Sequence, residues 1–419
     1  MYKILDRESL PDYLRQIPEV VAILGNDEPD IVEIGDGNLN FVFKVARRDD
    51  PSKAVIVKQA VPYLRMVGEE WPLGRDRMTY EIRALTLYNE LVGDYVPTIY
   101  HADEEMSTLI LEYLGDHRIL RTGMIEGIRY PLVAEHIGEF LAQTLFKTSA
   151  WSMPSIERRQ LMDRFTLNAE LCKLTEDFVF TFPYMRHESN YSNPATDAWA
   201  RDNIHTDSAF KLDVLAFKDL FVSKTDALLH ADLHTGSLMV NADESFIIDM
   251  EFAYFGPFGF DVGKIISNFL LCATSHLHRS DDDTYRRWCI DQIATIWTTF
   301  SHRFDSLWIA ATDTATDTAM LRDGLLTDEE FATLRSGFMQ NLLQESAGFA
   351  ACSIARRTLG IAGVADIRDI DDLEVRSRLE ISNLRLAKAL MSARHELLSI
   401  DDLSALVDTH FDSPFADSA

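Results

Sequence analysis

Short segments between residues 31 and 114 alternate apolar and polar positions, a pattern typical of strands with one buried face. Between two groups of such segments, the apolar residues Ile82, Leu85 and Tyr88 recur at helical spacing. The strands are predicted in "IVEIGDGNLNFVFKVA", "KAVIVKQA", "TIYHAD" and "STLILEYL", and the helix in "RDRMTYEIRALTLYNELV". This order predicts a small sheet with one helix packed on it.

Beyond Gly115 the apolar spacing is mainly helical, and one strand hairpin stands out in "SLMVNADESFIID". Long amphipathic stretches occur in "VAEHIGEFLAQTLFKTS", "DVGKIISNFLLCATSHL", "DTYRRWCIDQIATIWTTFSHRF" and "EISNLRLAKALMSARHELL". We therefore expect an α+β fold with two lobes. Residues 1–115 form the sheet-rich lobe and residues 116–419 the helical lobe.

The charge balance narrows the class of ligand. The 419 residues carry a formal net charge of −27, and 47% of them are hydrophobic, which is typical of a folded globular protein. Proteins that bind duplex nucleic acid neutralise phosphates with Lys and Arg, so the acidic balance argues against that function. An anionic ligand would have to be bound by metal ions, a few basic side chains or backbone amides.

The four cysteines are far apart and form no CxxC pair, which is typical of reduced residues in a cytoplasmic protein. The amino-terminal "MYKILDRESLPDYL" has charges where a signal peptide needs an apolar core. No segment offers about 20 uncharged apolar residues for a membrane span. The sequence predicts a cytoplasmic protein without a membrane partner.

A glycine-containing turn follows the first predicted strand. Gly35 and Gly37 form a G-x-G pattern in "IGDGNLNFVF", but a strand follows where a dinucleotide-binding loop would lead into a helix. The turn is therefore expected to close a hairpin. It could cover phosphates, because glycine lets the backbone approach them closely, or it could be an ordinary hairpin turn.

Lys58 lies in the apolar strand "AVIVKQA", and Glu81 lies on the helix that follows. In kinase-like enzymes, a lysine on the third strand holds ATP phosphates and pairs with a carboxylate on the next helix. Taken alone, Lys58 could equally lie on the exposed side of an edge strand, and Glu81 could be a solvated helix residue.

Five carboxylates stand close together in "LLHADLHTGSLMVNADESFIIDMEF". Asp243 and Glu244 fall in the predicted hairpin turn, where acidic residues are common. Asp232 and Asp249 instead come where predicted strands end, a usual place for catalytic side chains. Two such carboxylates suit Mg²⁺, which prefers oxygen ligands and shares its shell with water and substrate phosphates.

The glycine hairpin, Lys58, Glu81, Asp232 and Asp249 occur in the order of the protein-kinase-like fold, which the chain resembles. This resemblance implies a bilobal fold, with a small antiparallel-sheet N-lobe and a mainly helical C-lobe. The chain departs from that pattern at two places. Ser237 stands where the fold usually has a metal-binding Asn, and "DME" stands in place of "DFG".

The same departures resemble one family, the S-methyl-5-thioribose kinases. The matching segments are "GDGNLNFVF", "VKQA" with "EEWPLGRDR" after it, "HADLHTGSLMV", "DMEFAYFGPFGFDVG" and "ARRTLGIAGVADI". The resemblance implies transfer of the γ-phosphate of ATP, with Mg²⁺, to O1 of 5-methylthioribose in methionine salvage, by a homodimer. The family more often has "HGDLH" and "DPEF", so Ala231 and Met250 depart from it.

The family resemblance implies a role for each matching residue. Asp232 is expected to be the catalytic base or the group that orients the sugar hydroxyl, and Lys58 is expected to bind phosphates and be held by Glu81. Asp249 and Glu251 are expected to be metal ligands on an extended segment, where residues two apart project to the same side. The remaining nucleotide contacts implied are Gly35, Gly37, Asn38, Glu112 and Leu114, and the remaining sugar contacts are Trp71, Arg356 and Arg357.

Arg356 and Arg357 are neighbours on a predicted helix, where adjacent side chains point about 100° apart. Both can face one ligand only if the helix end is irregular, which "GIAG" shortly after them favours. The alternative is one buried ion pair and one solvated arginine.

Three classes of function stay open on the residues. The first is a small-molecule kinase, whose fold relatives act on aminoglycosides, choline and homoserine as well; an acidic protein could hold a cationic aminoglycoside. The second is a metal-dependent hydrolase that uses His230, Asp232 and His234 as an H-x-D-x-H site. The third is a nucleotide-binding protein without catalysis. The chain retains Asp232, Asp249 and Glu251, and this argues against the third class.

Overall fold

The computed structural model describes residues 2–34, 39–65, 68–314, 318–322 and 324–415. The strands are β1 (Asp30–Glu33), β2 (Asn40–Ala46), β3 (Ala54–Ala60), β4 (Tyr63–Leu64), β5 (Gly68–Pro72), β6 (Ile99–Asp103), β7 (Thr108–Glu112), β8 (Arg118–Ile119), β9 (Ala227–Leu229), β10 (Leu238–Val240), β11 (Ser245–Ile247) and β12 (Tyr254–Gly256). The α-helices are α1 (Leu10–Leu14), α2 (Pro18–Leu24), α3 (Arg77–Val92), α4 (Leu120–Ile125), α5 (Val133–Lys147), α6 (Ser155–Asp163), α7 (Ala169–Phe178), α8 (Pro194–Ala200), α9 (Ser208–Ser223), α10 (Gly259–Arg279), α11 (Thr284–Thr314), α12 (Asp328–Leu359), α13 (Ala365–Arg368), α14 (Leu373–Ala393) and α15 (Ile400–Asp412). Short 3-10 or π segments are η1 (Gly93–Tyr95), η2 (Phe182–Tyr184), η3 (Arg201–His205), η4 (Thr235–Ser237), η5 (Met250–Phe252) and η6 (Arg394–Glu396).

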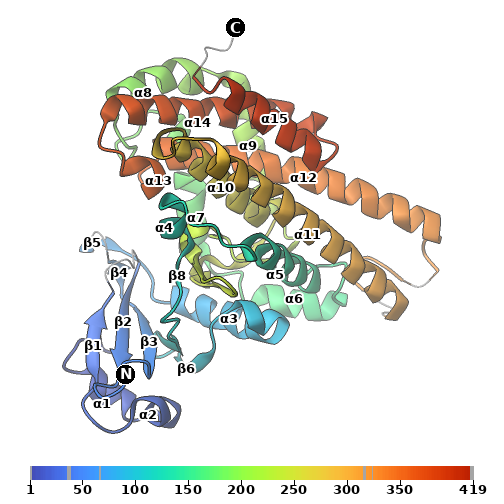
Figure 1. The fold of residues 1–419 in the computed structure, drawn as a ribbon. Helices are drawn as coiled ribbons and strands as arrows, with labels where there is room; N and C mark the ends of the chain where they lie inside the picture. Colours follow the sequence, from blue (N-terminus) through green and yellow to red (C-terminus); the bar gives the residue numbers. More distant parts are fainter. Residues whose placement is uncertain (1, 35–38, 66–67, 315–317, 323, 416–419) are drawn as a thin grey trace.

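An antiparallel five-stranded sheet, in the order β1-β2-β3-β7-β6, dominates the amino-terminal part of the chain (Figure 1). The predicted strands and the helix between them are confirmed. Val57 and Ile110 pack in the core under α1 and α2, whereas Leu109 packs in the core on the α3 side. Because side chains alternate along a strand, Lys58 follows Val57 on the opposite face of the sheet, the face toward α3.

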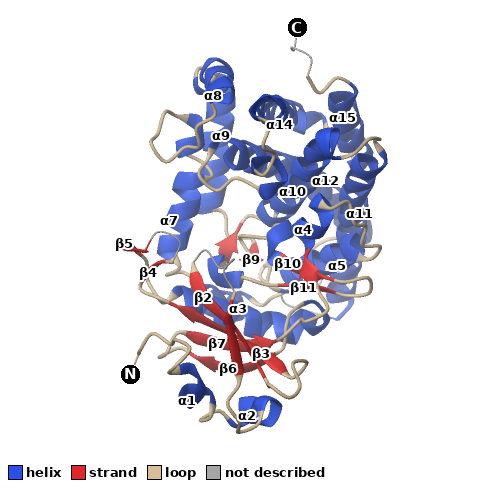
Figure 2. Ribbon diagram, turned by 60° about the vertical axis from the view of Figure 1, so that its left-hand side comes forward, coloured by secondary structure: helices blue, strands red, loops and turns tan. Residues whose placement is uncertain are grey.

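The rest of the chain is mainly helical, which confirms the α+β class, and it stacks above the sheet (Figure 2). Helix α10 lies at its centre, against α11, α12 and α14. Every residue from Gly259 to His276 is buried. The expected amphipathic helix is therefore wrong in one respect: α10 is enclosed on all sides, so the polar groups it carries must find partners inside the protein.

Helix α12 was predicted only around Arg356 and Arg357, near its end, and the rest of it was missed by the sequence pattern. Its first half is largely exposed, and its second half, from Leu342 to Leu359, is almost entirely buried. Neither half carries a single apolar stripe, which is the signal that hydrophobic spacing detects.

The predicted hairpin of β10 and β11 is confirmed, and two further short strand pairs lie beside it. β8 pairs with β10, and β9 pairs with β12, all of them antiparallel. The four cysteines are free, with Cys172 half-buried and the others buried. Among helices in the described ranges, none combines the length and the apolar composition of a membrane span.

Candidate active site

Asp232 and Asp249 lie on two neighbouring loops, just after β9 and β11. His230 joins these loops. Its Nδ1 accepts a hydrogen bond from the Asp232 amide (3.2 Å), and its Nε2 lies 2.8 Å from the carbonyl oxygen of Ile248. Since Nδ1 is the acceptor, Nε2 carries the proton and donates it to that carbonyl. His230 therefore sets the spacing of the two carboxylate loops.

The loop of Asp232 contains a left-handed residue. Ala231 has φ of +64°, a conformation that costs a residue with a Cβ atom about 1 kcal/mol or more. Asp261, at the start of α10, compensates: its carboxylate oxygens accept hydrogen bonds from the amides of His230 (2.7 Å) and Ala231 (2.9 Å). Glycine at the Ala231 position, as in "HGDLH", would adopt this φ without strain.

Ala231→Gly is expected to leave the melting temperature nearly unchanged. It removes about 1 kcal/mol of strain but adds about 0.4–1 kcal/mol of conformational entropy to the unfolded chain. Ala231→Val is expected to destabilise the protein by at least about 2 kcal/mol, because a β-branched residue is a marked outlier at positive φ. Calorimetric melting checks both. Ala253→Val, equally buried at φ −53°, controls for the added volume, and a loss no larger at Ala231 would contradict the strain.

Lys58 links the sheet to the loop of Asp249. Its Nζ lies 2.6 Å from Glu81 Oε1 and 2.6 Å from Asp249 Oδ1. β3 is a central strand and Lys58 is 5% exposed, so the edge-strand alternative is wrong. Glu81 is also buried, and burial raises its pKa to about 7 against the opposing effect of Lys58. Asp249 keeps 49% of its side chain exposed, which leaves carboxylate surface for a further ligand.

Glu251 does not follow Asp249 on an extended segment, as the sequence had predicted. Asp249 has φ of +67° and Met250–Phe252 form η5, so the segment is not extended and the argument from strand alternation is wrong. Glu251 is buried, accepts a hydrogen bond from Asn40 Nδ2 (2.6 Å) and lies 3.8 Å from Arg77 Nε. Burial raises the pKa of Glu251, although Lys58 and Arg77 act in the opposite direction. Asn40 and Arg77, which the sequence did not single out, tie Glu251 to β2 and α3.

The remaining residues predicted to contact the nucleotide lie on the first part of the chain. Glu112 ends β7, and Leu114 follows on the segment that leads into the helical part, its carbonyl accepting a hydrogen bond from the His117 amide (3.3 Å). Gly35, Gly37 and Asn38 lie outside the described residues.

Trp71 lies on β5, a short strand that pairs with β4. Its ring centroid is 6.1 Å from that of Phe178, the last residue of α7. Trp71 therefore packs across from the sheet-rich part onto the helical part. A Cβ on Gly360, just beyond α12, would lie 3.7 Å from the Phe178 carbonyl, so Trp71 contacts a residue close to the end of α12.

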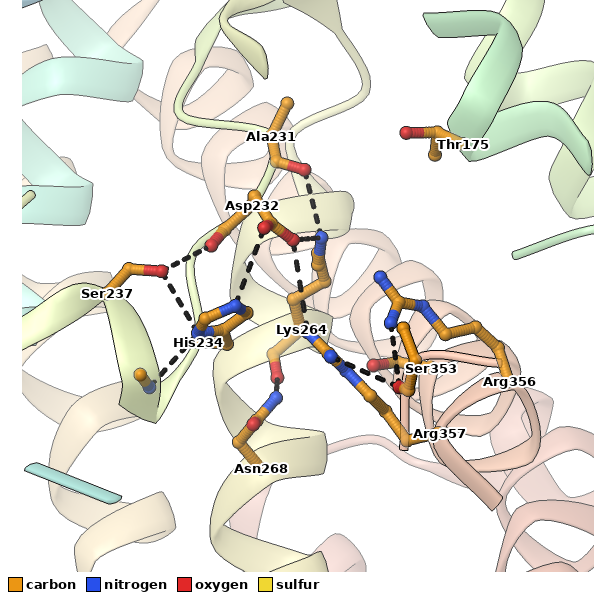
Figure 3. A network of polar contacts seen from close by, with 12 residues as sticks. Thr175, Ala231, Asp232, His234, Ser237, Lys264, Asn268, Ser353, Arg356 and Arg357 are labelled. Carbon is orange, nitrogen blue, oxygen red and sulfur yellow. Dashed lines mark hydrogen bonds and ion pairs between the residues drawn. The ribbon is translucent and has the colours of Figure 1, made fainter. Parts of the chain in front are cut away.

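Basic side chains surround Asp232 (Figure 3). Lys264 of α10 donates to Asp232 Oδ1 and to the Ala231 carbonyl (3.0 Å), and Arg357 Nη2 lies 4.0 Å from Oδ1. Burial raises the pKa of Asp232, but the charge of Lys264 and the hydrogen bond of His234 outweigh it, so that this pKa is well below its usual value. Asp232 is therefore a carboxylate at neutral pH.

His234 is a neutral donor to Asp232. Its Nδ1 accepts a hydrogen bond from the Gly236 amide (3.0 Å), so Nε2 carries the proton, and Nε2 lies 3.4 Å from Asp232 Oδ2. Burial lowers the pKa of His234 to about 3. The Ser237 hydroxyl is occupied within the same loop, donating to the Asp232 carbonyl (2.8 Å).

These contacts argue against the hydrolase alternative. Both ring nitrogens of His230 face protein atoms, and so do those of His234. Within the described ranges there is also no group of three or more His, Cys, Asp or Glu side chains placed to hold a metal ion. The H-x-D-x-H segment is built to position Asp232.

Arg356 and Arg357 converge beyond the end of their helix. Their Nη1 atoms lie 3.2 and 3.3 Å from the same carbonyl oxygen, that of Ala362. Helix α12 ends at Leu359, and this allows the side chains of Arg356 and Arg357 to reach the same carbonyl oxygen. The alternative of one buried ion pair and one solvated arginine is wrong only for Arg356, which is half-buried. Arg357 is buried and lies 4.0 Å from Asp232 Oδ1, although its Nε and Nη2 lack a hydrogen-bond partner among described residues.

Arg121 of α4 is a fourth basic side chain on the same side of the site as Lys264, Arg356 and Arg357. It contacts Thr235 Oγ1 (3.2 Å), Asn268 Oδ1 (2.9 Å) and Asp366 Oδ2 (3.5 Å). Burial and then the charges of Arg356 and Arg121 lower the pKa of Arg357, whereas the charge of Asp232 raises it. The cationic wall, defined here as Arg121, Lys264, Arg356 and Arg357, is thus a local exception in a chain of net charge −27.

The geometry suits transfer of an anionic group to a hydroxyl. An ionised carboxylate can orient or deprotonate the hydroxyl, and unpaired guanidinium donors can bind oxyanions. Across the site, Lys58 and Asp249 offer a cation and a carboxylate of the kind that hold nucleotide phosphates.

Comparisons with known proteins agree with this chemistry. Residues 30–286 match the phosphotransferase enzyme family. The methylthioribose kinase of Exiguobacterium sibiricum is 39% identical over 383 residues, covering 91% of this chain and 93% of the relative. Methylthioribose kinase 1 of Oryza sativa subsp. japonica is 37% identical over 407 residues, covering 95% and 94%. A solved structure of Plasmodium vivax ethanolamine kinase, 11% identical, covers 93% of this chain and 91% of its own, with a TM-score of 0.47.

Proposed function

This chain belongs to the methylthioribose kinases within the phosphotransferase enzyme family, and we propose that it transfers the γ-phosphate of ATP to O1 of 5-methylthioribose. The product would be 5-methylthioribose 1-phosphate, formed in methionine salvage. The observation that carries the proposal is the ionised Asp232 beside Arg357, whose Nη2 lies 4.0 Å from Asp232 Oδ1 and whose Nε and Nη2 have no hydrogen-bond partner among the described residues. An acceptor hydroxyl and a transferring phosphoryl group need these two kinds of partner next to each other.

The substrate hydroxyl would donate its proton to Asp232, which orients the oxygen for attack on the γ-phosphorus and accepts the proton. The new O–P bond forms as the bond from the γ-phosphorus to the bridging oxygen breaks, and ADP leaves with that oxygen. Arg357 and Arg356 would bind the sugar and the equatorial phosphoryl oxygens, whose charge rises during transfer. Lys58, held by Glu81, would bind the phosphates of ATP, and backbone groups of Glu112 and Leu114 would bind the adenine.

The residues present fit Mg²⁺. Asp249 has an exposed carboxylate beside Lys58, and Glu251 supplies a second carboxylate two residues later, both of the oxygen type that Mg²⁺ prefers. Bound there, Mg²⁺ would neutralise charge on the ATP phosphates.

The cationic wall favours methylthioribose over the substrates of related kinases. Aminoglycosides and choline are cations, and four basic side chains beside Asp232 would repel them at short range. A neutral sugar that becomes a phosphate ester is instead attracted more strongly as the reaction proceeds. The net charge of the whole chain, which suggested a cationic substrate, is thus a poor guide to this site.

Product analysis tests the position of transfer. After reaction of 5-methylthioribose with MgATP, the ³¹P signal of the product is expected to couple to the anomeric proton. Coupling to a proton of another ring carbon would contradict O1 as the acceptor.

Glu251→Gln is expected to weaken the Mg²⁺ dependence, raising the half-saturating Mg²⁺ concentration by roughly 10-fold or more, because it removes one negative charge from the metal site. Turnover should fall at low Mg²⁺ and recover partly as Mg²⁺ rises. The competing role is structural, since Glu251 also holds Asn40 and Arg77. Asn40→Ala is the matched control, because it breaks that contact and keeps the carboxylate. An unchanged Mg²⁺ requirement in Glu251→Gln, with a lowered melting temperature in both variants, would refute the ligand role.

A further inference from the structure

We propose that Lys264 is a positioning residue for phosphoryl transfer: its ammonium group holds Oδ1 of Asp232, so that Oδ2 faces the acceptor hydroxyl. The inference rests on the proposed function, because Asp232 must be the carboxylate that receives the hydroxyl proton. Lys264 would act through Asp232 and would not itself touch the reacting atoms.

Lys264 is buried, so its positive charge requires an acidic partner such as Asp232. It lies in the enclosed helix α10, its side chain is 4% exposed, and the ring of Phe260 lies 5.1 Å from its Nζ. An ammonium group buried among apolar side chains costs several kcal/mol unless it is paired and hydrogen-bonded. Its two acceptors are Asp232 Oδ1 and the Ala231 carbonyl, both on the loop of the catalytic carboxylate.

The two hydrogen bonds of Lys264 hold the carboxylate of Asp232 in one orientation. By binding both the side chain of Asp232 and the backbone of the preceding residue, Lys264 restricts rotation of the carboxylate relative to its loop (Figure 3). Oδ2 is then approached by His234 at 3.4 Å, a long contact that leaves a lone pair for a substrate hydroxyl. Orientation of this kind is worth large factors in rate because reacting atoms must align within a fraction of an ångström.

Charged groups reach Lys264 from the loop of Asp232 and from α12. Asp232 faces it from the catalytic loop, Arg356 and Arg357 from α12, and Asp261 lies on its own helix. Burial lowers the pKa of Lys264 to about 8, with Asp232 opposing and the two arginines adding to the effect. The ammonium form therefore predominates at neutral pH and is lost as the pH rises through about 8.

A double-mutant cycle tests the role. Lys264→Met keeps the length of the side chain and removes the charge; we expect kcat to fall by roughly 10- to 100-fold with KM for ATP unchanged. In the Asp232→Asn background the same change is expected to cost no further activity, because the group it positions is gone. The acid limb of the kcat profile should also move to higher pH in Lys264→Met, since a charge that lowers the pKa of Asp232 is removed.

Lys224→Met is the matched control. Lys224 also has two acceptors, the carboxylates of Glu345 (2.7 Å) and Asp226 (2.8 Å), but it lies at the end of α9 and none of its partners is in the site. We expect it to lower the melting temperature and leave kcat and its pH profile unchanged.

Two results would overturn the proposal. One is a near-normal kcat in Lys264→Met, and the other is a loss of kcat from Lys264→Met that is as large in the Asp232→Asn background as in the wild type. Normal turnover in Asp232→Asn alone would instead contradict the proposed function, so the two failures are distinguishable. If Lys264→Met does not fold, Lys264→Arg keeps the charge and decides the matter. It should retain the acid limb at the wild-type pH, because a guanidinium supplies the same positive charge beside Asp232. An acid limb that moves in Lys264→Arg although the charge is kept would refute the role of Lys264.

Discussion

Asp232→Asn is expected to lower turnover by roughly 10²- to 10⁴-fold, the usual range for loss of a positioned acid or base. The amide has the same shape as the carboxylate, so the fold and MgATP binding should survive. It cannot accept the hydroxyl proton, and it leaves Lys264 and Arg357 without their counter-charge, so a lower melting temperature should accompany the lost activity.

Steady-state turnover and calorimetric MgATP binding separate these effects. Asp243→Asn, in the exposed turn between β10 and β11, is the control with the same chemical change, and it should behave as wild type. Near-normal turnover in Asp232→Asn would remove Asp232 from the mechanism.

Asp249→Asn is expected to lower turnover by roughly 10²-fold or more at saturating ATP, because a carboxylate ligand of Mg²⁺ supports several kcal/mol of charge stabilisation in the transition state. The substitution also weakens the contact between this residue and Lys58, so the affinity for MgADP should fall. The affinity for 5-methylthioribose should change little, since in the proposed function Asp232 and the cationic wall bind the sugar.

Titration of Mg²⁺ at fixed ATP, together with MgADP binding, checks this prediction, and Asp243→Asn again serves as the control. A variant that keeps both the wild-type half-saturating Mg²⁺ and the wild-type turnover would exclude Asp249 from the metal site.

Periodicity explains what could be predicted. The period-2 alternation that marks β3 also decides that Lys58 points away from Val57 and toward α3, so the contact with Glu81 follows from strand and helix assignment together. The strand ends before Asp232 and Asp249 were visible as apolar runs that stop at polar residues.

Features that depend on backbone conformation or on distant segments could not be predicted in the same way. The positive φ of Asp249 and the 3-10 turn that follows redirect Glu251 toward Asn40, and no spacing rule encodes that turn. Arg356 and Arg357 converge because their helix ends at Leu359, a boundary that hydrophobic spacing fixes poorly.

Lys264 was missed although the sequence carries a signal for it. In "FDVGKIISNFLL" it is a lone cation in an apolar run, and such a residue on an enclosed helix must be paired with an acid. The pairing with Asp232 spans 32 residues and required the fold to be found. The homodimer and the cytoplasmic location stay predictions from the sequence.

The most direct test of the central claim is the initial rate of ADP release from MgATP with four acceptors: 5-methylthioribose, ribose, choline and kanamycin. We predict the highest kcat/KM for 5-methylthioribose, at least about 10-fold above ribose because ribose lacks the apolar methylthio group. Choline and kanamycin should give no release above the rate without acceptor, since the cationic wall repels them. A kcat/KM for ribose, choline or kanamycin equal to or greater than that for 5-methylthioribose would contradict the account.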